Sequence, residues 1–258
     1  MLKKRVIFTL LLEDQNFVLS RNFRLQSFGN IQTLMQRYNF SKIAFSIDEI
    51  IIIDVSRKEK TLVDFCNHIK KINQTCFIPI GAGGGIRDFS QTKKILNSGA
   101  DKVIINSILY EDPDLVFEIA ESYGSQSIIA SIDFKRNSNN YDVYINNGEK
   151  KIIDNFSSWI NKVSKLPIGE IYLNSMDNDG TGNGYLFEIL DLIPSEFNIP
   201  IIIAGGAGNY KHFELGLNHN KVDAVATANL FNFVGDGFIN ARKQLISKNY
   251  NVTKWKEL

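Results

Sequence analysis

Short runs of Ile, Val, Leu and Phe recur along the chain, and most are followed by a turn and then an amphipathic stretch. Their nearly continuous apolar character is typical of strands buried on both faces of a parallel sheet. The pattern predicts strands at Arg5–Leu11, Glu49–Val55, Phe77–Ala82, Lys102–Asn106, Ile128–Asp133, Glu170–Ser175, Pro200–Ala204 and Ala224–Asn229. Helical spacing predicts intervening helices, among them Thr61–Ile72, Phe89–Ser98, Pro113–Tyr123, Asn155–Lys165 and Tyr185–Ile193.

Strands that alternate with helices in this way, over 258 residues, indicate an α/β protein built as one closed (β/α)8 barrel, a TIM barrel, spanning residues 1–258. A doubly wound open sheet is the alternative. Two connections, from Leu12 to about Gly29 and from Lys135 to about Asp154, are longer than the rest. The second contains a hairpin pattern closed at Asn147-Gly148. In a barrel both connections lie at the C-terminal face, where active sites are built.

The two halves of the chain resemble each other. Gly83-Gly84-Gly85 after the third strand matches Gly205-Gly206-Ala207-Gly208 after the seventh, 122 positions later. At the same offset, Asn106-Ser107 falls on Ala228-Asn229. This repeat predicts two fused half-barrels related by a pseudo-twofold axis.

Composition narrows the classes of function. Lys and Arg number 29 against 28 Asp and Glu, so the net charge of +1 gives no drive toward nucleic acid or an anionic membrane. No apolar run reaches the ~18 residues of a transmembrane helix, and the basic N-terminus lacks a signal-peptide cleavage site. Cys66, Cys76 and the three histidines show no metal-ligand spacing. We therefore expect a reduced, cytoplasmic protein with no metal and no cofactor.

The glycine-rich turns are candidate phosphate sites, because glycine lets backbone N–H groups approach an anion closely. The first candidate site comprises Gly83, Gly84, Gly85, Asn106 and Ser107, and the second comprises Gly205, Gly206, Ala228 and Asn229. Two phosphate sites on opposite sides of one barrel mouth would suit a small molecule with a phosphate at both ends. The alternative is that these glycines only make tight turns.

The segment from Asp177 to Gly182, after the sixth strand, superficially resembles a calcium loop. It follows a strand and lacks the ligand at position 12 of such a loop, which argues against calcium. We interpret it as a polar loop at the mouth and add Asp177, Gly180 and Thr181 to the candidate phosphate-binding residues.

One carboxylate at the predicted mouth could act as a general acid or base. Asp133 ends the fifth strand. Its symmetry-related position is Leu11, so the partner acid of a symmetric pair is missing. Glu13 and Asp14 are nearby substitutes, although they lie beyond the strand. The alternative role for Asp133 is that of a loop cap.

Four predicted strands begin with an ionisable residue, namely Arg5, Glu49, Lys102 and Glu170. First residues of parallel strands meet at the N-terminal rim of a barrel, where two cations and two anions could form a closed ring of ion pairs around the axis. The alternative is that each residue is charged only because strand starts lie near solvent.

Along essentially its whole length the chain resembles the HisF family, the cyclase subunits of imidazole glycerol phosphate synthase. The resemblance rests on residues 1–7, 83–89, 99–106, 124–127, 177–181 and 204–208. It implies a HisH-like glutaminase partner, contacted by Asp101, and an ammonia gate formed by the four charged strand starts. It further implies that ammonia crosses the barrel and attacks a phosphoribulosyl substrate, giving imidazole glycerol phosphate and aminoimidazole carboxamide ribonucleotide.

The chain departs from that family at the mouth. The family's two catalytic aspartates fall on Leu11 and Asp133, a lysine falls on Leu19 and a serine falls on Asn229. Loss of one acid of a pair typically lowers the rate by ~10²–10⁴. The Leu10-Leu11-Leu12 run resembles a HisF-like subgroup associated with sugar amidation in glycan biosynthesis.

Our leading hypothesis from the sequence is therefore an ammonia-conducting barrel that serves a separate sugar amidotransferase, with a nucleotide-linked acetamido sugar as the acceptor. The alternative is an ordinary cyclase of histidine biosynthesis that relies on Asp133 alone or with Glu13 or Asp14. A sugar-phosphate isomerase of the same pathway and a non-enzymatic scaffold for the glutaminase are further alternatives.

Overall fold

The computed structural model describes residues 3–38, 40–57, 61–138, 140–229 and 231–255. Parallel strands close into a barrel in which each pairs with the next and the last pairs with the first. Their order is β1 (Arg5–Glu13), β4 (Glu49–Asp54), β5 (Ile80–Gly83), β6 (Lys102–Ile105), β7 (Ile128–Asn137), β10 (Glu170–Ser175), β11 (Ile201–Ala204) and β12 (Ala224–Thr227). The predicted (β/α)8 barrel is confirmed, and the open sheet is wrong.

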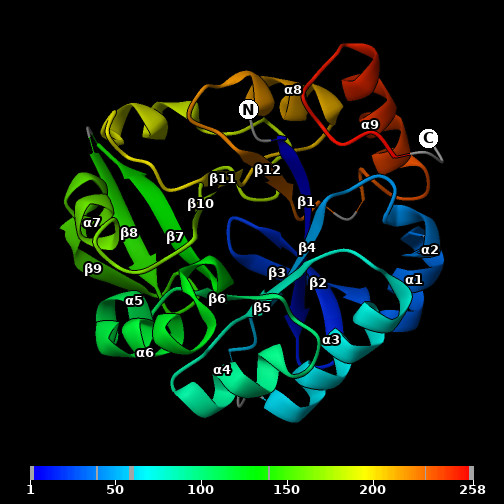
Figure 1. Cartoon of the computed structure of the whole chain (residues 1–258). Coiled ribbons are helices and arrows are strands. Elements are labelled where there is room, and N and C mark those ends of the chain that lie inside the picture. The colour runs from blue at the N-terminus through cyan, green and yellow to red at the C-terminus, as the bar shows by residue number, and fades with distance from the viewer. Residues whose placement is uncertain (1–2, 39, 58–60, 139, 230, 256–258) are drawn as a thin grey trace.

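Helices form a belt around the strands, as Figure 1 shows in a view along the barrel. The belt comprises α1 (Ile31–Tyr38), α2 (Phe40–Ile43), α3 (Leu62–Thr75), α4 (Phe89–Leu96), α5 (Ile108–Glu111), α6 (Pro113–Tyr123), α7 (Phe156–Val163), α8 (Tyr210–Asn218), α9 (Gly237–Ser247) and the 3₁₀ helices η1 (Ser125–Ser127) and η2 (Phe187–Leu192). A large cluster of apolar side chains fills the space between strands and helices, while a smaller one fills the barrel interior.

Both long connections fold into antiparallel hairpins that extend the barrel strands beyond their predicted ends. The first contains β2 (Asn16–Arg21) and β3 (Arg24–Gly29), and the second contains β8 (Asn140–Ile145) and β9 (Lys150–Asn155). The turn between β8 and β9 includes Asn147 and Gly148, both with positive φ, as the sequence predicts.

Several ends are shifted by a few residues, and two elements differ more clearly from the prediction. The strand expected from Phe77 begins only at Ile80, and Phe77 is 91% exposed. Pro79 has no N–H group to join the ladder. The segment expected as a helix from Tyr185 folds instead as the short η2, which ends before Ile193, where Pro194 favours an extended backbone.

The structure shifts the glycine repeat by one position relative to the match of Gly83 with Gly205 that the sequence predicts. Gly83 is the last residue of β5 and corresponds to Ala204 at the end of β11. A Cβ atom on Gly83 would clash with the backbone of Ile104 on the next strand, so this glycine permits close approach of two strands. Gly84 and Gly85 are the loop counterparts of Gly205 and Gly206.

A buried ion pair fastens the last helix to the barrel. The side chain of Arg242 on α9 is fully buried, and its Nη2 lies 2.5 Å from Oδ2 of Asp48, just before β4. Its Nε donates to the carbonyl of Ser46, and the same Asp48 oxygen accepts the backbone N–H of Val6. A single guanidinium therefore holds together α9 and the start of the β1–β4 seam.

We expect Arg242→Leu to lower the free energy of unfolding by about 3–5 kcal/mol, because it leaves the Asp48 carboxylate buried without its cation. Chemical denaturation measures the difference. Lys248→Leu, which removes an exposed partner of Glu214 at the end of the same helix, is the control and should change stability little. Equal effects of the two variants would contradict this interpretation.

Candidate functional site

A cavity of about 420 Å³ opens at the C-terminal ends of the barrel strands, and we call it the mouth. Its lining includes Asp133 and nine of the predicted phosphate-binding residues, namely Gly84, Gly85, Asn106, Ser107, Gly180, Gly205, Gly206, Ala228 and Asn229. Gly83, Asp177 and Thr181 lie outside the lining. Asp177 instead accepts a hydrogen bond from the backbone N–H of Arg136.

The two glycine loops have equivalent conformations on opposite sides of the mouth. Gly84 and Gly205 have φ values of +114° and +85°, and φ is also positive at the next glycine of each loop, Gly85 and Gly206. A Cβ on Gly84 would clash with the backbone of Asp54, and one on Gly205 would lie 2.6 Å from the carbonyl oxygen of Ser175. Both loops therefore need glycine to lie against the neighbouring strand end.

Asp133 lies at the centre of a polar cluster in the mouth and is 9% exposed. Its Oδ1 accepts a hydrogen bond of 2.8 Å from Asn174 on β10, and its Oδ2 accepts one of 3.2 Å from Asn106. Burial raises the pKa of Asp133 to about 7, the hydrogen bond from Asn174 opposes this shift, and the charge of Asp179 adds to it. A carboxyl group with this pKa can both donate and accept a proton near neutral pH.

Asp179 is a mouth residue that the sequence analysis did not select. Its carboxylate accepts hydrogen bonds from Oγ of Ser20 and from the backbone N–H of Phe23, so it ties the first hairpin to the loop after β10. Burial raises its pKa, against the hydrogen bond from Ser20. The repeated acid in the Asp177–Asp179 loop was the available signal, but only the fold shows which one faces the cavity.

Leu11 lines the mouth, as its symmetry relation to Asp133 predicts. The proposed substitute acids do not. Glu13 pairs with Asn16 in the first hairpin, and the backbone N–H of Asp14 donates to Oγ of Ser56. Neither is part of the cavity lining. In the described part of the chain, the carboxylates that line the mouth are Asp133, Asp179 and Glu149, and Glu149 forms an ion pair with Arg57.

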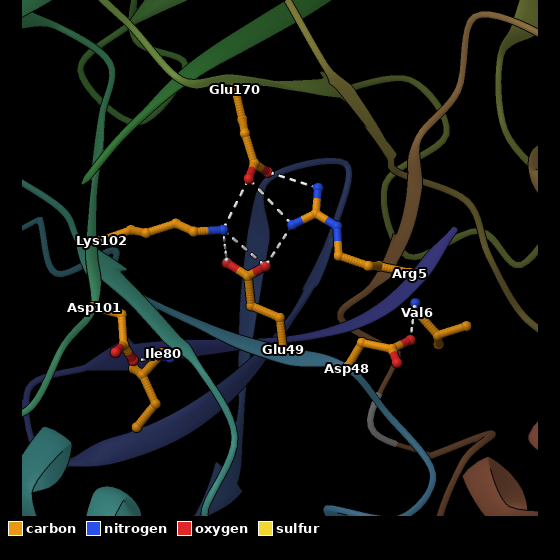
Figure 2. A network of polar contacts seen from close by, with 8 residues as sticks. All are labelled: Arg5, Val6, Asp48, Glu49, Ile80, Asp101, Lys102 and Glu170. Carbon is orange, nitrogen blue, oxygen red and sulfur yellow. Dashed lines mark hydrogen bonds and ion pairs between the residues drawn. The ribbon is translucent and has the colours of Figure 1, made fainter. Parts of the chain in front are cut away.

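At the opposite end of the barrel the four charged strand starts form a closed ring of ion pairs, which we call the charge ring (Figure 2). Arg5 lies 2.8 Å from both Glu49 and Glu170, and Lys102 lies 3.0 Å from Glu49 and 2.8 Å from Glu170. All four side chains point toward a common centre on the barrel axis.

The two acids of the charge ring differ in their surroundings. Glu49 is almost fully buried, and this burial raises its pKa against the charges of Lys102 and Arg5. Burial would also raise the pKa of Glu170, but its hydrogen bond with Arg5 and the charges of Arg5 and Lys102 outweigh it, so its pKa is lowered.

Apolar side chains separate the charge ring from the mouth. Five isoleucines (Ile7, Ile51, Ile104, Ile129 and Ile202) occupy the barrel interior together with Tyr172, Ala204, Ala224 and Ala226. The hydroxyl groups of Tyr172 and Thr9 are 3.1 Å apart, buried, and reach the floor of the mouth. The axis of the barrel is therefore a packed apolar column with ionic contacts at one end and a polar cavity at the other.

Asp101, the predicted contact to a glutaminase, lies beside the charge ring on an exposed position. Its Oδ2 accepts a hydrogen bond from the backbone N–H of Ile80, which caps the start of β5 (Figure 2). Asp48 and Asp223 make equivalent caps at Val6 and Ile201. Asp101 thus has a structural role in the barrel rim that the sequence did not reveal.

Within the described ranges, no three His, Cys, Asp or Glu side chains gather where they could hold a metal ion. Among the same residues, the helices are too short or too polar to cross a lipid bilayer.

The raised pKa of Asp133 predicts a pH-dependent stability. In the unfolded chain this carboxyl should have a pKa of ~3.9. Between that pH and about 7 the folded protein binds the proton more tightly than the unfolded chain, so raising the pH lowers the free energy of unfolding. We expect Asp133→Asn to be more stable than the parent at pH 8, by at most about 4 kcal/mol. The gain should shrink by about 1.4 kcal/mol per pH unit between pH 7 and 4. Urea unfolding of both proteins at several pH values tests this, and a pH-independent difference would contradict it.

Comparisons with known proteins agree with this geometry. Residues 5–235 match the model of a family described as "Histidine biosynthesis protein". "Putative imidazole glycerol phosphate synthase subunit hisF2" of Parasynechococcus marenigrum is 43% identical over 95% of this chain and 91% of its own length. "Imidazole glycerol phosphate synthase subunit HisF" of Pelodictyon phaeoclathratiforme is 35% identical over 98% and 99%, and that of Prosthecochloris aestuarii is 37% identical over 90% and 92%. The chain therefore belongs to the HisF branch of the histidine biosynthesis protein family.

Proposed function

We propose that this chain is the synthase subunit of an imidazole glycerol phosphate synthase type of complex, with its chemistry at the mouth. The observation that carries the proposal is Asp133, a buried carboxyl with a pKa of about 7 that lies between two glycine loops suited to phosphate. The names of the relatives support the cyclase of histidine biosynthesis. This reverses the order of hypotheses that the sequence alone favours, because no relative named above supports the role in glycan amidation.

A phosphoribulosyl substrate with two phosphates would place one on Gly84-Gly85 and the other on Gly205-Gly206. Its reacting centre would then lie over Asp133. The carboxyl group can take a proton from the attacking ammonia and return one to a leaving nitrogen, since its pKa lies near the working pH.

The other end of the barrel supports a glutaminase partner that delivers ammonia. The charge ring closes the axis at the rim where Asp101 is exposed. Behind the ring, the described interior side chains are five isoleucines and three alanines with Tyr172, and hydroxyl groups come in below the mouth at Thr9, Tyr172 and Ser131. Such a lining admits neutral ammonia far more readily than ammonium, because burying an unpaired charge is costly. Passage requires side-chain movement, since the ion pairs and the isoleucines fill the axis.

One observation keeps sugar amidation as a second candidate. Leu11 replaces the acid expected opposite Asp133. The other acids of the described lining are engaged elsewhere, Asp179 by Ser20 and Phe23 and Glu149 by Arg57. Under this alternative the barrel conducts ammonia to a separate amidotransferase, and its own mouth has altered or weakened chemistry.

Ammonium salt and the phosphoribulosyl substrate, supplied to the purified subunit, test the cyclase directly by the release of imidazole glycerol phosphate. We expect turnover that depends on Asp133, with Asp133→Asn slower by about 10²–10⁴ because the acid–base group is lost. Asp114→Asn, an exposed aspartate of α6, is the matched control and should retain the parent rate. No turnover by the parent protein would favour the second candidate.

Lys102→Met tests the charge ring in a complex reconstituted with a HisH-like glutaminase. Removing this cation leaves Glu49 and Glu170 facing each other across the axis. We expect the glutamine-dependent rate to fall several-fold more than the rate with added ammonium, because only the first requires transfer through the ring. An equal fall in both rates, measured on the same preparation, would show that the ring has only a structural role.

A further inference from the structure

Two pairs of side chains occupy equivalent places in the two half-barrels. Leu11 on β1 lies in register with Ile53 on β4, and Asp133 on β7 lies in register with Asn174 on β10. The second pair is joined by a hydrogen bond of 2.8 Å. The first pair is apolar at both positions. The first half-barrel therefore has no counterpart of this polar pair at either position.

More apolar side chains surround this first pair in the mouth. Phe23, Leu25 and Val55 line the cavity together with Leu11 and Ile53, and we call these five residues the apolar wall. Leu11, Phe23, Leu25 and Val55 belong to neither of the two hydrophobic clusters described above. Ile53 packs against the cluster that fills the barrel interior. Their apolar surface therefore faces the cavity, where a bound molecule could cover it.

Phe23 is held at the cavity by its own backbone. Its φ of +63° is rare for a bulky residue and is sustained by hydrogen bonds from both sides of the mouth. The N–H group donates to Oδ2 of Asp179, and the carbonyl accepts from Nη2 of Arg57 at 2.8 Å. The hairpin turn is thereby fixed across the mouth, with an aromatic residue as part of the lining.

The apolar wall adjoins the first glycine loop. Ile53 is in register with Gly83, and the missing Cβ of Gly84 leaves room for the backbone of Asp54, which lies between Ile53 and Val55. Arg57 and Arg87 line the same side of the cavity. A phosphate held by Gly84-Gly85 would therefore have its ester substituent beside an apolar surface, whereas the polar pair of Asp133 and Asn174 lies on the opposite half-barrel.

We propose that the apolar wall is a binding subsite for an uncharged, apolar group carried by a phosphate ester that is anchored on Gly84-Gly85. This inference rests on the phosphate-binding mouth of the proposed function. It adds a second class of ligand beside the phosphoribulosyl substrate, namely an amphipathic phosphate ester with hydrocarbon toward β1 and β4 and polar groups toward β7 and β10.

A homologous series of ligands tests the subsite in the parent protein. Inorganic phosphate and methyl, ethyl, n-propyl and n-butyl phosphate are titrated at constant ionic strength, and each Kd is measured by phosphorus NMR. We expect n-butyl phosphate to bind about tenfold more tightly than ethyl phosphate, because each buried methylene contributes ~0.8 kcal/mol and ~1.4 kcal/mol corresponds to tenfold in Kd.

Variants assign this gain to the wall. Leu11→Asn keeps a side chain of similar size but is polar, and Val55→Thr is a gentler change in case the first variant folds poorly. Each should reduce the ratio of the ethyl to the n-butyl Kd, and Leu11→Asn should reduce it to less than threefold. Leu215→Asn makes the same change at an exposed site on α8, and it should keep the parent ratio.

The outcomes separate this inference from the proposed function. If inorganic phosphate binds but chain length has no effect on Kd, the apolar subsite is wrong and the phosphate site stands. If chain length matters equally in the parent and in Leu11→Asn, the alkyl group lies elsewhere and the subsite is again wrong. If none of the ligands binds, the phosphate-binding mouth itself is contradicted, and the subsite with it.

Discussion

Register between parallel strands decides which strand side chains of this protein reach the barrel interior. Because successive residues of a strand point to opposite faces, only alternate residues reach the barrel interior. On β1 these are Arg5 in the charge ring, Ile7 and Thr9 along the axis, and Leu11 at the mouth. A slip of one residue would turn all of them toward the helices. The charge ring, the apolar column and the mouth therefore all depend on the same strand register around the barrel, which the pairing of β12 with β1 closes.

The parts that the sequence could predict are those that depend on strand position alone. The charge ring needs only the first residues of four strands, and Asp133 needs only the end of a fifth. What the sequence could not predict depends on loop conformation. Asp179 faces the mouth and Asp177 does not because the first hairpin crosses to the loop after β10. The sequence assigns Gly83 to the phosphate-binding loop because three consecutive glycines carry no signal for where the strand ends. The structure places Gly83 in β5, where the backbone of Ile104 approaches it closely.

The charge ring illustrates how the fold tolerates buried ionisable groups. Each cation contacts both acids and each acid contacts both cations, so no charge in the ring lacks a counter-ion. Taking four charges out of water is expensive, and only this mutual pairing offsets the cost. The arrangement is closed yet built from flexible Lys and Glu side chains, which distinguishes it from the isoleucines behind it. The ring is thus the part of the axis where a small rearrangement could be coupled to a partner at the rim.

The asymmetry of the mouth limits what its chemistry can be. A pair of carboxylates can hold one proton each and act on two atoms of a substrate at once, whereas under the proposed function Asp133 would use the same oxygen atoms in succession. A pKa near 7 makes that possible, since the protonated and ionised forms are then close in free energy at neutral pH. Hydrogen bonds from Asn174 and Asn106 would hold the carboxyl group fixed between the two steps. Reactions in which a proton removed in one step returns in the next therefore suit this site better than reactions that need an acid and a base at opposite faces of the substrate.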